Sequence, residues 1–165
     1  MRESPLNYAA MDTPEALSAL RDLVDKEAIR DLARRYAHHV WQLEVDALVD
    51  LFAEDGEMDT SLEEPIRGRE ALREAFQRLV EDNQADLQPF VHNHVIELDG
   101  DRARGTAYVD LRSVLDGRSM LGSGYYRDHY VRQEEGWKFQ SRSLVLRFFV
   151  PHLDGWAETQ SPGDE

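Results

Sequence analysis

The sequence contains no cysteine, has few basic residues for its size and lacks any long apolar segment. The absence of cysteine excludes disulfides, thiolate nucleophiles and zinc sites built on thiolates, and it is typical of a reducing compartment. The 33 acidic residues outnumber the 19 basic ones, and the resulting net charge of -14 repels the phosphates of nucleic acid. No stretch approaches the roughly 18 apolar residues of a membrane span, and the first residues show no secretory pattern. We therefore expect a cytoplasmic protein without nucleic-acid or membrane partners.

Length and composition predict one folded unit. A chain of 165 residues with 41% hydrophobic content can build a single sizeable core. Residues 1–11 show no hydrophobic periodicity, and residues 157–165 are mostly polar. We therefore expect a flexible arm at the start, a single domain over residues 12–156 and a polar tail.

The first half of the chain has helical periodicity. Asp12, Thr13 and Pro14 are typical of a helix start, so a long helix is expected over residues 12–40. Its apolar face collects Ile29, Leu32, Tyr36, Val40 and Leu43. A short helix is expected over residues 45–55, with Leu48, Leu51 and Phe52 as its apolar stripe, and a further helix over residues 68–82.

The second half changes to the alternation that is typical of strands. Four β-rich segments are separated by Asp99-Gly100, Asp116-Gly117 and Glu135-Gly136. Such regular turns predict an antiparallel meander. Helices followed by a meander make an α+β domain, in which the helices bury their apolar stripes against one face of a curved sheet.

Several segments, in this order, resemble the SnoaL-like branch of the NTF2-like superfamily. They are "AIRDLARRYAHHVWQLEVDALVDLFAEDG", "IRGREAL", "HNHVIELDGDRARGTAYV" and "GYYRDHYVRQEEGWKFQSR". The resemblance implies a cone in which the N-terminal helices pack in the concave face of a curved, mostly antiparallel sheet. It also implies an apolar pocket at the mouth of the cone. Relatives of this kind include scytalone dehydratase, ketosteroid isomerase and the non-catalytic β-subunits of ring-hydroxylating dioxygenases.

The resemblance places four site positions, of which two match. The helix tyrosine of the dehydratase-like relatives falls on Tyr36, and the last-strand arginine falls on Arg142. Their catalytic aspartate falls on Trp41, and their catalytic histidine falls on Pro89. Neither tryptophan nor proline can exchange a proton, so the usual acid-base pair is replaced.

Other residues are candidates for the missing base. His39 lies on the flank of the apolar helix face and could act with Asp59 or Asp128 as its carboxylate partner. The alternative is a partly exposed histidine at a helix end, where the helix dipole favours it. His92 is a further candidate, because it follows Pro89 by only three residues. The predicted catalytic set is Tyr36, His39, Asp59 and Arg142.

The "HNH" motif at residues 92–94 has two interpretations. His92 and His94 share one face of a strand and could form a metal pair, but the sequence offers no clear third ligand. The resemblance instead turns Val91 and Asn93 towards the interior and both histidines away from it. We therefore expect no metal and no cofactor. The predicted ligand-binding residues are Trp41, Phe52, Val91, Asn93, Tyr108, Tyr126 and Asp128.

Each candidate also has a structural interpretation. Tyr36 could be an acid in the pocket or a core tyrosine, and Trp41 could line the pocket or fill the core. Asp128 and Arg142 could form a buried ion pair or the polar end of the pocket.

Two functions remain open. The first is a lyase or isomerase that acts on a hydrophobic, oxygenated small molecule without a cofactor. The second is a non-catalytic ligand-binding or assembly subunit. A homodimer or higher homo-oligomer is expected through the outer face of the sheet, where we expect apolar side chains from Val109, Leu111, Leu144, Leu146 and Phe148.

Overall fold

The computed structural model describes residues 13–60, 64–81 and 87–152. The predicted arm and tail lie outside these residues. The chain forms three helices and six strands within them: α1 (Pro14–Gln42), α2 (Val45–Val49), β1 (Phe52–Asp59), β2 (Ile66–Arg67), α3 (Arg69–Glu81), β3 (Leu87–Asp99), β4 (Arg102–Leu115), β5 (Arg118–Gln133) and β6 (Gly136–Pro151).

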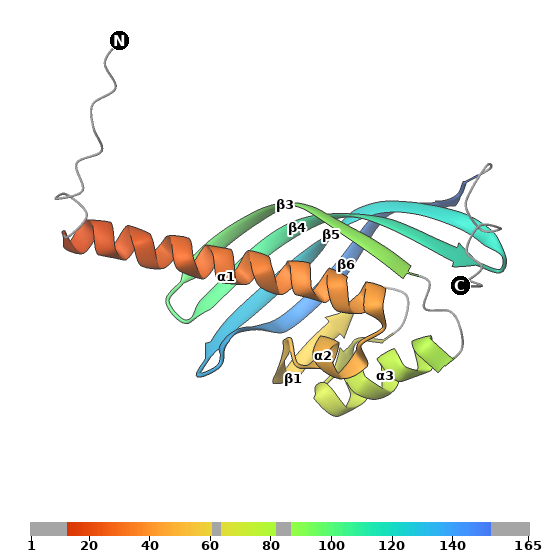
Figure 1. The fold of residues 1–165 in the computed structure, drawn as a ribbon, viewed down its shortest axis with the longest axis horizontal. Coiled ribbons are helices and arrows are strands. Elements are labelled where there is room, and N and C mark those ends of the chain that lie inside the picture. Colours follow the sequence, from red (N-terminus) through yellow and green to blue (C-terminus); the bar gives the residue numbers. More distant parts are fainter. Residues whose placement is uncertain (1–12, 61–63, 82–86, 153–165) are drawn as a thin grey trace, which may run out of the picture.

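Helix α1 runs for 29 residues along the concave side of the sheet (Figure 1). Thr13 caps its start, because the Thr13 Oγ1 accepts a hydrogen bond from the Ala16 N–H at 3.2 Å. Pro14 occupies the first turn, where its missing N–H has no cost. Ile29, Leu32 and Tyr36 are buried against the sheet, so the predicted apolar face is confirmed for these residues.

The end of α1 is a tight turn built on a residue with positive φ. Leu43 adopts φ 56°, and its N–H donates to the Val40 carbonyl at 3.3 Å. The Glu44 N–H donates to the His39 carbonyl at 3.0 Å. These two bonds form a Schellman motif, which usually has glycine at the position of Leu43. The motif turns the chain back over the last turn of the helix and brings Glu44 beside His39.

The prediction of a helix over residues 45–55 is wrong beyond Val49. Phe52 begins strand β1, which pairs in parallel with β6 through Met58 and Arg142. Local apolar spacing favoured a helix here, but the ladder with a strand more than eighty residues later decides the conformation.

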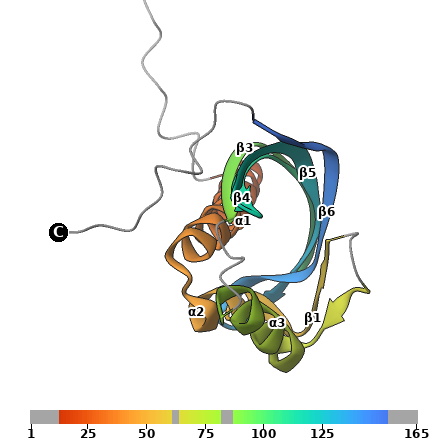
Figure 2. The same cartoon turned by 90° about the vertical axis from the view of Figure 1, so that its right-hand side faces the viewer.

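The six strands form one sheet in the order β2-β1-β6-β5-β4-β3. Strands β3 to β6 are an antiparallel meander, with positive-φ glycines Gly100, Gly117 and Gly136 at its turns. The sheet curves around α1, while α2 and α3 close the lower end (Figure 2). The predicted α+β architecture, with helices in the concave face, is confirmed.

A bulge in β3 reverses the predicted facing of the "HNH" motif. The register with β4 shifts between Val91 and His94, which moves one residue out of the alternation. Asn93 is therefore exposed, whereas His94 is half-buried and faces Tyr130. The expectation that Asn93 faces the interior and His94 faces away is wrong.

The outer face of the sheet is more polar than expected. Val109, Leu111 and Leu144 belong to the buried core, so placing them outside was wrong. In β4, Val109 and Leu111 alternate with exposed residues such as Asp110 and Arg112, which take the outer face instead. Phe148 is 46% exposed. The homo-oligomer stays a prediction.

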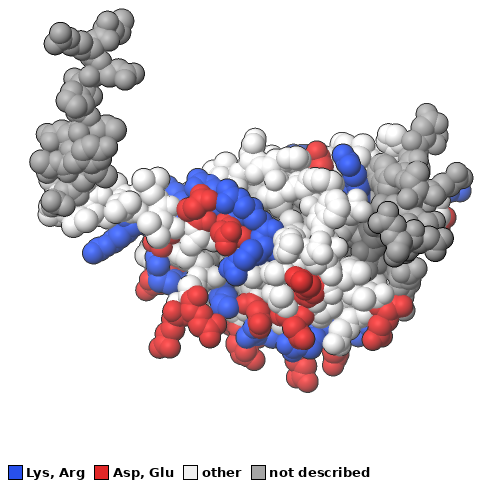
Figure 3. Space-filling model, viewed as in Figure 1, with Lys and Arg blue, Asp and Glu red and all other residues white. Residues whose placement is uncertain are grey.

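Acidic and basic side chains lie close together along α1, and acidic side chains gather along the lower edge of the view in Figure 3. Two arginines of α1 are paired with nearby carboxylates, since Arg34 contacts Glu27 at 2.6 Å and Arg35 contacts Asp31 at 3.1 Å. Among the described residues, no helix is both long and apolar enough to cross a membrane.

Candidate functional site

A cavity of about 220 Å³ lies between the three helices and the inner face of the sheet. Most of its wall is aliphatic or aromatic, as in small-molecule sites generally. The wall is formed by Tyr36, His39, Val40, Leu43, Val45, Leu48, Met58, Thr60, Ile66, Ala75, Phe76, Leu79, Val80, Leu87, Ser113, Tyr126 and Leu144. The polar groups among them are few, so each can orient a bound molecule.

Tyr36 places a neutral hydroxyl group at the cavity wall. Its side chain is 4% exposed, and within the described ranges its hydroxyl has only the sulfur of Met58 as a hydrogen-bond partner, at 4.0 Å. Burial raises the pKa of Tyr36 to about 12, although the positive charge of Arg142 opposes this effect. Tyr36 is therefore protonated at neutral pH and can donate a hydrogen bond to a ligand oxygen.

His39 and Glu44 form a carboxylate–imidazole pair at the cavity. The Nδ1 atom of His39 lies 2.6 Å from Oε2 of Glu44. A carboxylate accepts hydrogen bonds, so the proton sits on Nδ1 and the Nε2 lone pair is left for another partner. His39 is 16% exposed, and it lies one helical turn after Tyr36 on the same face of α1.

A buried ionic network lies next to the cavity, around Arg142. The guanidinium donates two hydrogen bonds to Asp128, at 2.9 and 2.8 Å, and both side chains are fully buried. It also lies over the rings of Tyr36 and Tyr126, at 4.3 and 4.0 Å from their centroids. Burial alone would lower the pKa of Arg142, but the charge of Asp128 outweighs this and raises it. The buried ion pair considered for Asp128 and Arg142 is present.

The network continues to strand β3 through Tyr130 and His94. The Tyr130 hydroxyl donates to Asp128 at 2.7 Å, and Nε2 of His94 lies 3.0 Å from the same hydroxyl. Since that hydroxyl hydrogen goes to Asp128, Nε2 is the donor in the second bond. Burial lowers the pKa of His94 to about 4, so the imidazole is neutral. Its Nδ1 is buried without a hydrogen-bond partner in the described part of the chain.

Of the predicted catalytic residues, Tyr36 and His39 line the cavity. Arg142 is not part of the cavity wall but lies against Tyr36 and Tyr126, which are. Asp59 is elsewhere, because it follows the inward-facing Met58 and accepts a hydrogen bond from Ser143 at 2.7 Å. The partner of His39 is Glu44, so the prediction of Asp59 or Asp128 in this role is wrong.

Of the predicted ligand-binding residues, Tyr126 lines the cavity. The other predicted ligand-binding residues are not part of the cavity wall. Phe52 is core, and Val91 packs against the core. Tyr108 is 47% exposed on the outer face, and Asn93 is exposed at the bulge. Trp41 is 41% exposed and bonds to strand β3, so its predicted place in the pocket wall is wrong.

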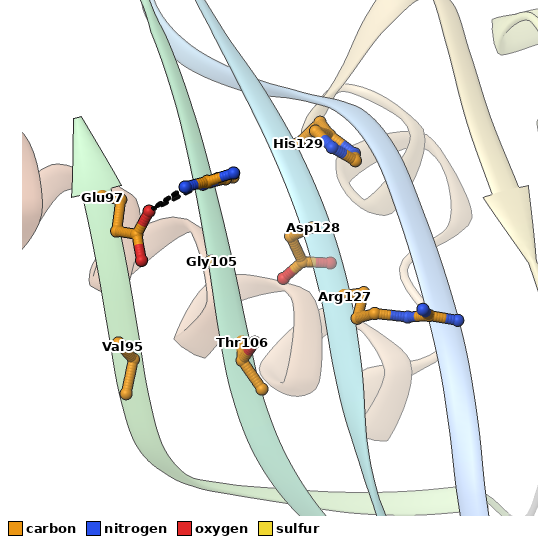
Figure 4. A pocket seen from close by; sticks show the side chains of 8 residues that line it. Val95, Glu97, Gly105, Thr106, Arg127, Asp128 and His129 are labelled. Atoms are coloured by element: carbon orange, nitrogen blue, oxygen red, sulfur yellow. Dashed lines mark hydrogen bonds and ion pairs between the residues drawn. The ribbon is translucent and has the colours of Figure 1, made fainter. Parts of the chain in front are cut away.

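A second hollow, of about 210 Å³, lies on the outer face of the sheet. Its rim includes Glu97, Arg104, Arg127 and His129, all of them exposed, and Arg104 is ion-paired with Glu97 (Figure 4). The Asp128 side chain is committed to Arg142 on the other face. The inner cavity is therefore the candidate site.

Sequence reasoning missed Glu44, Thr60, Ser113 and His94. Glu44 follows the turn at the end of α1, and this turn has Leu43 at the positive-φ position where glycine would have indicated it in the sequence. Ser113 could have been found from strand alternation, because it shares the inward face of β4 with Val109 and Leu111. His94 required knowledge of the bulge.

Comparisons with known proteins agree with this architecture. Residues 21–143 match a family described as the SnoaL-like domain. A candidate aromatic ring hydroxylase from Novosphingobium aromaticivorans is 32% identical, with a TM-score of 0.72 over 80% of this chain and 96% of that chain. No curated protein sequence gives a match.

Two further structures share the fold at lower identity. A candidate scytalone dehydratase from the same organism is 21% identical, with a TM-score of 0.72 over 79% of this chain and 89% of that chain. A hexachlorocyclohexane dehydrochlorinase from Novosphingobium barchaimii is 21% identical, with a TM-score of 0.76 over 83% of this chain and 96% of that chain.

Proposed function

Because the chain belongs to the SnoaL-like domain family and has its NTF2-like cone, we propose that it binds a small hydrophobic, oxygenated molecule in the inner cavity and removes a proton from it. The fold is related to dehydratases and dehydrochlorinases. In the proposal, His39 is the base, Glu44 orients it and Tyr36 donates a hydrogen bond to the substrate oxygen. The class of reaction is that of a lyase or isomerase.

The observation that carries the proposal is the 2.6 Å contact between His39 Nδ1 and Glu44 Oε2 at the wall of an apolar cavity. A carboxylate that holds one imidazole nitrogen fixes the tautomer and favours the charged ring that forms when the other nitrogen accepts a proton. The usual pair of the relatives is replaced by Trp41 and Pro89, and His39 with Glu44 supplies the same two chemical groups from the turn after α1.

The cavity volume restricts the substrate. Ligand sites for drug-sized molecules begin at about 300 Å³, and this cavity is smaller, at about 220 Å³. It suits a molecule with one or two rings. The apolar wall favours a ring, and the hydroxyls of Tyr36, Thr60 and Ser113 favour a carbonyl or hydroxyl group on it.

The proposed step conserves atoms and charge. His39 Nε2 takes a proton from the carbon next to the carbonyl, and the electron pair of that C–H bond moves onto the carbonyl oxygen as an enolate. The neutral Tyr36 hydroxyl donates a hydrogen bond to this oxygen. In a β,γ-unsaturated ketone the enolate is a dienolate, and His39 returns the proton to the γ-carbon, which is an isomerisation. In a ketone with a leaving group on the β-carbon, the carbonyl re-forms, the former C–H electron pair makes the α,β double bond and the group leaves with its own bonding pair, which is an elimination.

Binding without chemistry is the second candidate. The contact between Trp41 and Pro89 favours it, because the positions that carry the catalytic pair in the dehydratase-like relatives are used here to join α1 to β3. In this case His39 and Glu44 form only a polar edge to the cavity.

Exchange of ketone α-protons for deuterium tests the chemistry without knowledge of the natural substrate. Cyclohexanone and α-tetralone are incubated with the chain in D₂O and followed by proton NMR, while binding is measured by isothermal titration calorimetry. We expect binding and exchange with the natural sequence. His39→Gln should retain binding and lose roughly 10²-fold or more of the exchange rate.

Two further variants provide the controls. Ala75→Phe fills the cavity from α3 and should abolish both binding and exchange, with circular dichroism as the check on folding. His92→Gln changes an exposed histidine outside the cavity and should change neither. Binding without exchange would support the second candidate, and exchange that survives His39→Gln would contradict the assigned base.

A further inference from the structure

His38, His39 and Glu44 bring three metal-ligating side chains together at the C-terminal end of α1. One donor atom from each lies within 4.8 Å of the others. We propose that this cluster, the α1-end triad, binds a divalent first-row transition-metal ion of the Zn²⁺ kind. Two imidazole nitrogens and one carboxylate oxygen are a donor set that suits such ions.

The backbone holds the triad together. Neighbouring residues on a helix normally point about 100° apart, yet the rings of His38 and His39 meet at a centroid distance of 5.4 Å and an angle of 64°. Glu44 reaches them because the Schellman motif at Leu43 reverses the chain, with the Glu44 N–H bonded to the His39 carbonyl at 3.0 Å. The turn after α1 thus places a carboxylate beside the two histidines.

The geometry needs only small side-chain movements to hold an ion. Zinc–nitrogen and zinc–oxygen distances of about 2 Å place neighbouring donor atoms about 3.3 Å apart. Donor atoms that lie within 4.8 Å of one another therefore need to approach by at most about 1.5 Å. His38 and Glu44 are exposed and can rotate, while His39 is held in the cavity wall. An ion bound by three protein ligands keeps open positions for water or for a ligand oxygen.

Electrostatics favour a cation at this point. The carbonyl ends of α1 carry the negative pole of the helix dipole, and Glu44 adds a negative charge. The whole chain carries a net charge of -14, which attracts cations generally.

The proposal of a metal site does not rest on the proposed function, although the two sites share His39 and Glu44. His39 and Glu44 can hydrogen-bond to each other or ligate an ion, and an ion that takes both removes the base from the cavity wall. Zn²⁺ is therefore expected to inhibit proton abstraction.

Calorimetry of tag-free protein, stripped with a chelator and titrated with Zn²⁺, tests the site. We expect one ion per chain, with at least about tenfold weaker binding in His38→Ala and in Glu44→Gln, because even the loss of a residue that only supports a ligand costs about 10- to 100-fold in metal affinity. His92→Ala is the matched control, because His92 is an exposed histidine that pairs with Asp110 at 3.0 Å on another element. Co²⁺ provides a second readout, through a visible absorption band that should disappear in the same two variants.

The proposal fails if the natural sequence binds no Zn²⁺, or if His38→Ala binds it as tightly. Ketone exchange is measured separately in the presence of chelator, so the two proposals can fail independently. Exchange without Zn²⁺ binding removes only the metal site, and Zn²⁺ binding without exchange removes only the proton chemistry.

Discussion

The indole Nε1 of Trp41 donates a hydrogen bond to the carbonyl oxygen of Pro89 at 3.0 Å. The Trp41 ring also packs edge-on against Phe90, with centroids 5.2 Å apart. These are the two positions at which the dehydratase-like relatives are expected to carry an aspartate and a histidine. Proline is tolerated in β3 because this strand is at the edge of the sheet. The contact shows that the two positions are neighbours in space.

Restoring the usual pair should therefore restore a second base. We expect Trp41→Asp with Pro89→His to exchange ketone α-protons even when His39→Gln is also present, because an aspartate beside an imidazole makes that imidazole a competent base. The measurement is deuterium exchange by NMR. Trp41→Asp alone is the control, and an inactive triple variant that still folds and binds α-tetralone would contradict the prediction.

Breaking the buried ion pair should lower the free energy of unfolding strongly, whereas replacing both partners with apolar residues should lower it little. Asp128→Ala leaves Arg142 buried without its partner and should lower the free energy of unfolding by about 3–5 kcal/mol. Asp128→Leu combined with Arg142→Met should recover most of this loss, because the pair then becomes apolar. Urea unfolding measures both.

An exposed ion pair is the matched comparison. Glu27→Ala removes the 2.6 Å contact with Arg34 at the surface of α1, and it should lower the free energy of unfolding far less than Asp128→Ala, because solvent screens the exposed pair. If Asp128→Ala costs no more than Glu27→Ala, the interior around Arg142 is wetter than the packing indicates.

His94 should make the protein less stable in mild acid. Its pKa is about 4 in the folded state because of burial, below the ordinary value of 6.5, so the unfolded chain binds a proton between these values that the folded chain does not. Stability should therefore fall as the pH is lowered from 6.5 to 4, by about 1–2 kcal/mol after allowance for partial exposure, and this contribution levels off below the folded pKa.

His94→Asn tests this assignment, since the amide keeps a hydrogen-bonding group near Tyr130 but does not titrate. Urea unfolding across the same pH window should show a smaller slope in the variant. Equal slopes would mean that other groups cause the acid sensitivity.

The ring of Tyr36 should contribute more to stability than its hydroxyl does. In the proposed reaction, the hydroxyl should be the important group. The Tyr36 ring meets Phe52, Tyr126 and Phe139 with centroids 6.2, 5.8 and 5.9 Å away, so Tyr36→Ala should cost about 3–5 kcal/mol. Tyr36→Phe removes only a weak bond to sulfur and should cost less than about 1 kcal/mol. Thermal unfolding measures both, and Tyr36→Phe should slow ketone exchange without abolishing it. A large loss of stability in Tyr36→Phe would reveal a stronger partner for the hydroxyl.

The order of elements could be predicted from the sequence because it depends on local signals. Thr13 and Pro14 start α1, and glycines at the three meander turns separate the long strands. The extent of α2 could not be predicted, because the conformation at Phe52 is decided by pairing with β6 and not by its neighbours in sequence.

The candidate site was most predictable where it depends on regular periodicity. Tyr36 and His39 lie one turn apart on α1, and helical periodicity brings them together. Glu44 depends on an αL leucine and Asn93 on a bulge, and neither backbone feature has a marker in the sequence. The turn at Leu43 is made by backbone bonds to Val40 and His39, and the bulge by the register between β3 and β4.

The parallel pairing of β1 with β6 has a consequence for how the molecule folds. Strand β1 can pair with β6 only after the chain near Ser141 and Arg142 has reached it, more than eighty residues away in sequence. Strands β3 to β6, in contrast, can form by successive hairpins. Distant pairings such as that of β1 with β6 are slow to form. The meander should therefore form first, and the cavity, whose wall runs from Tyr36 to Leu144, should be the last part of the protein to become complete.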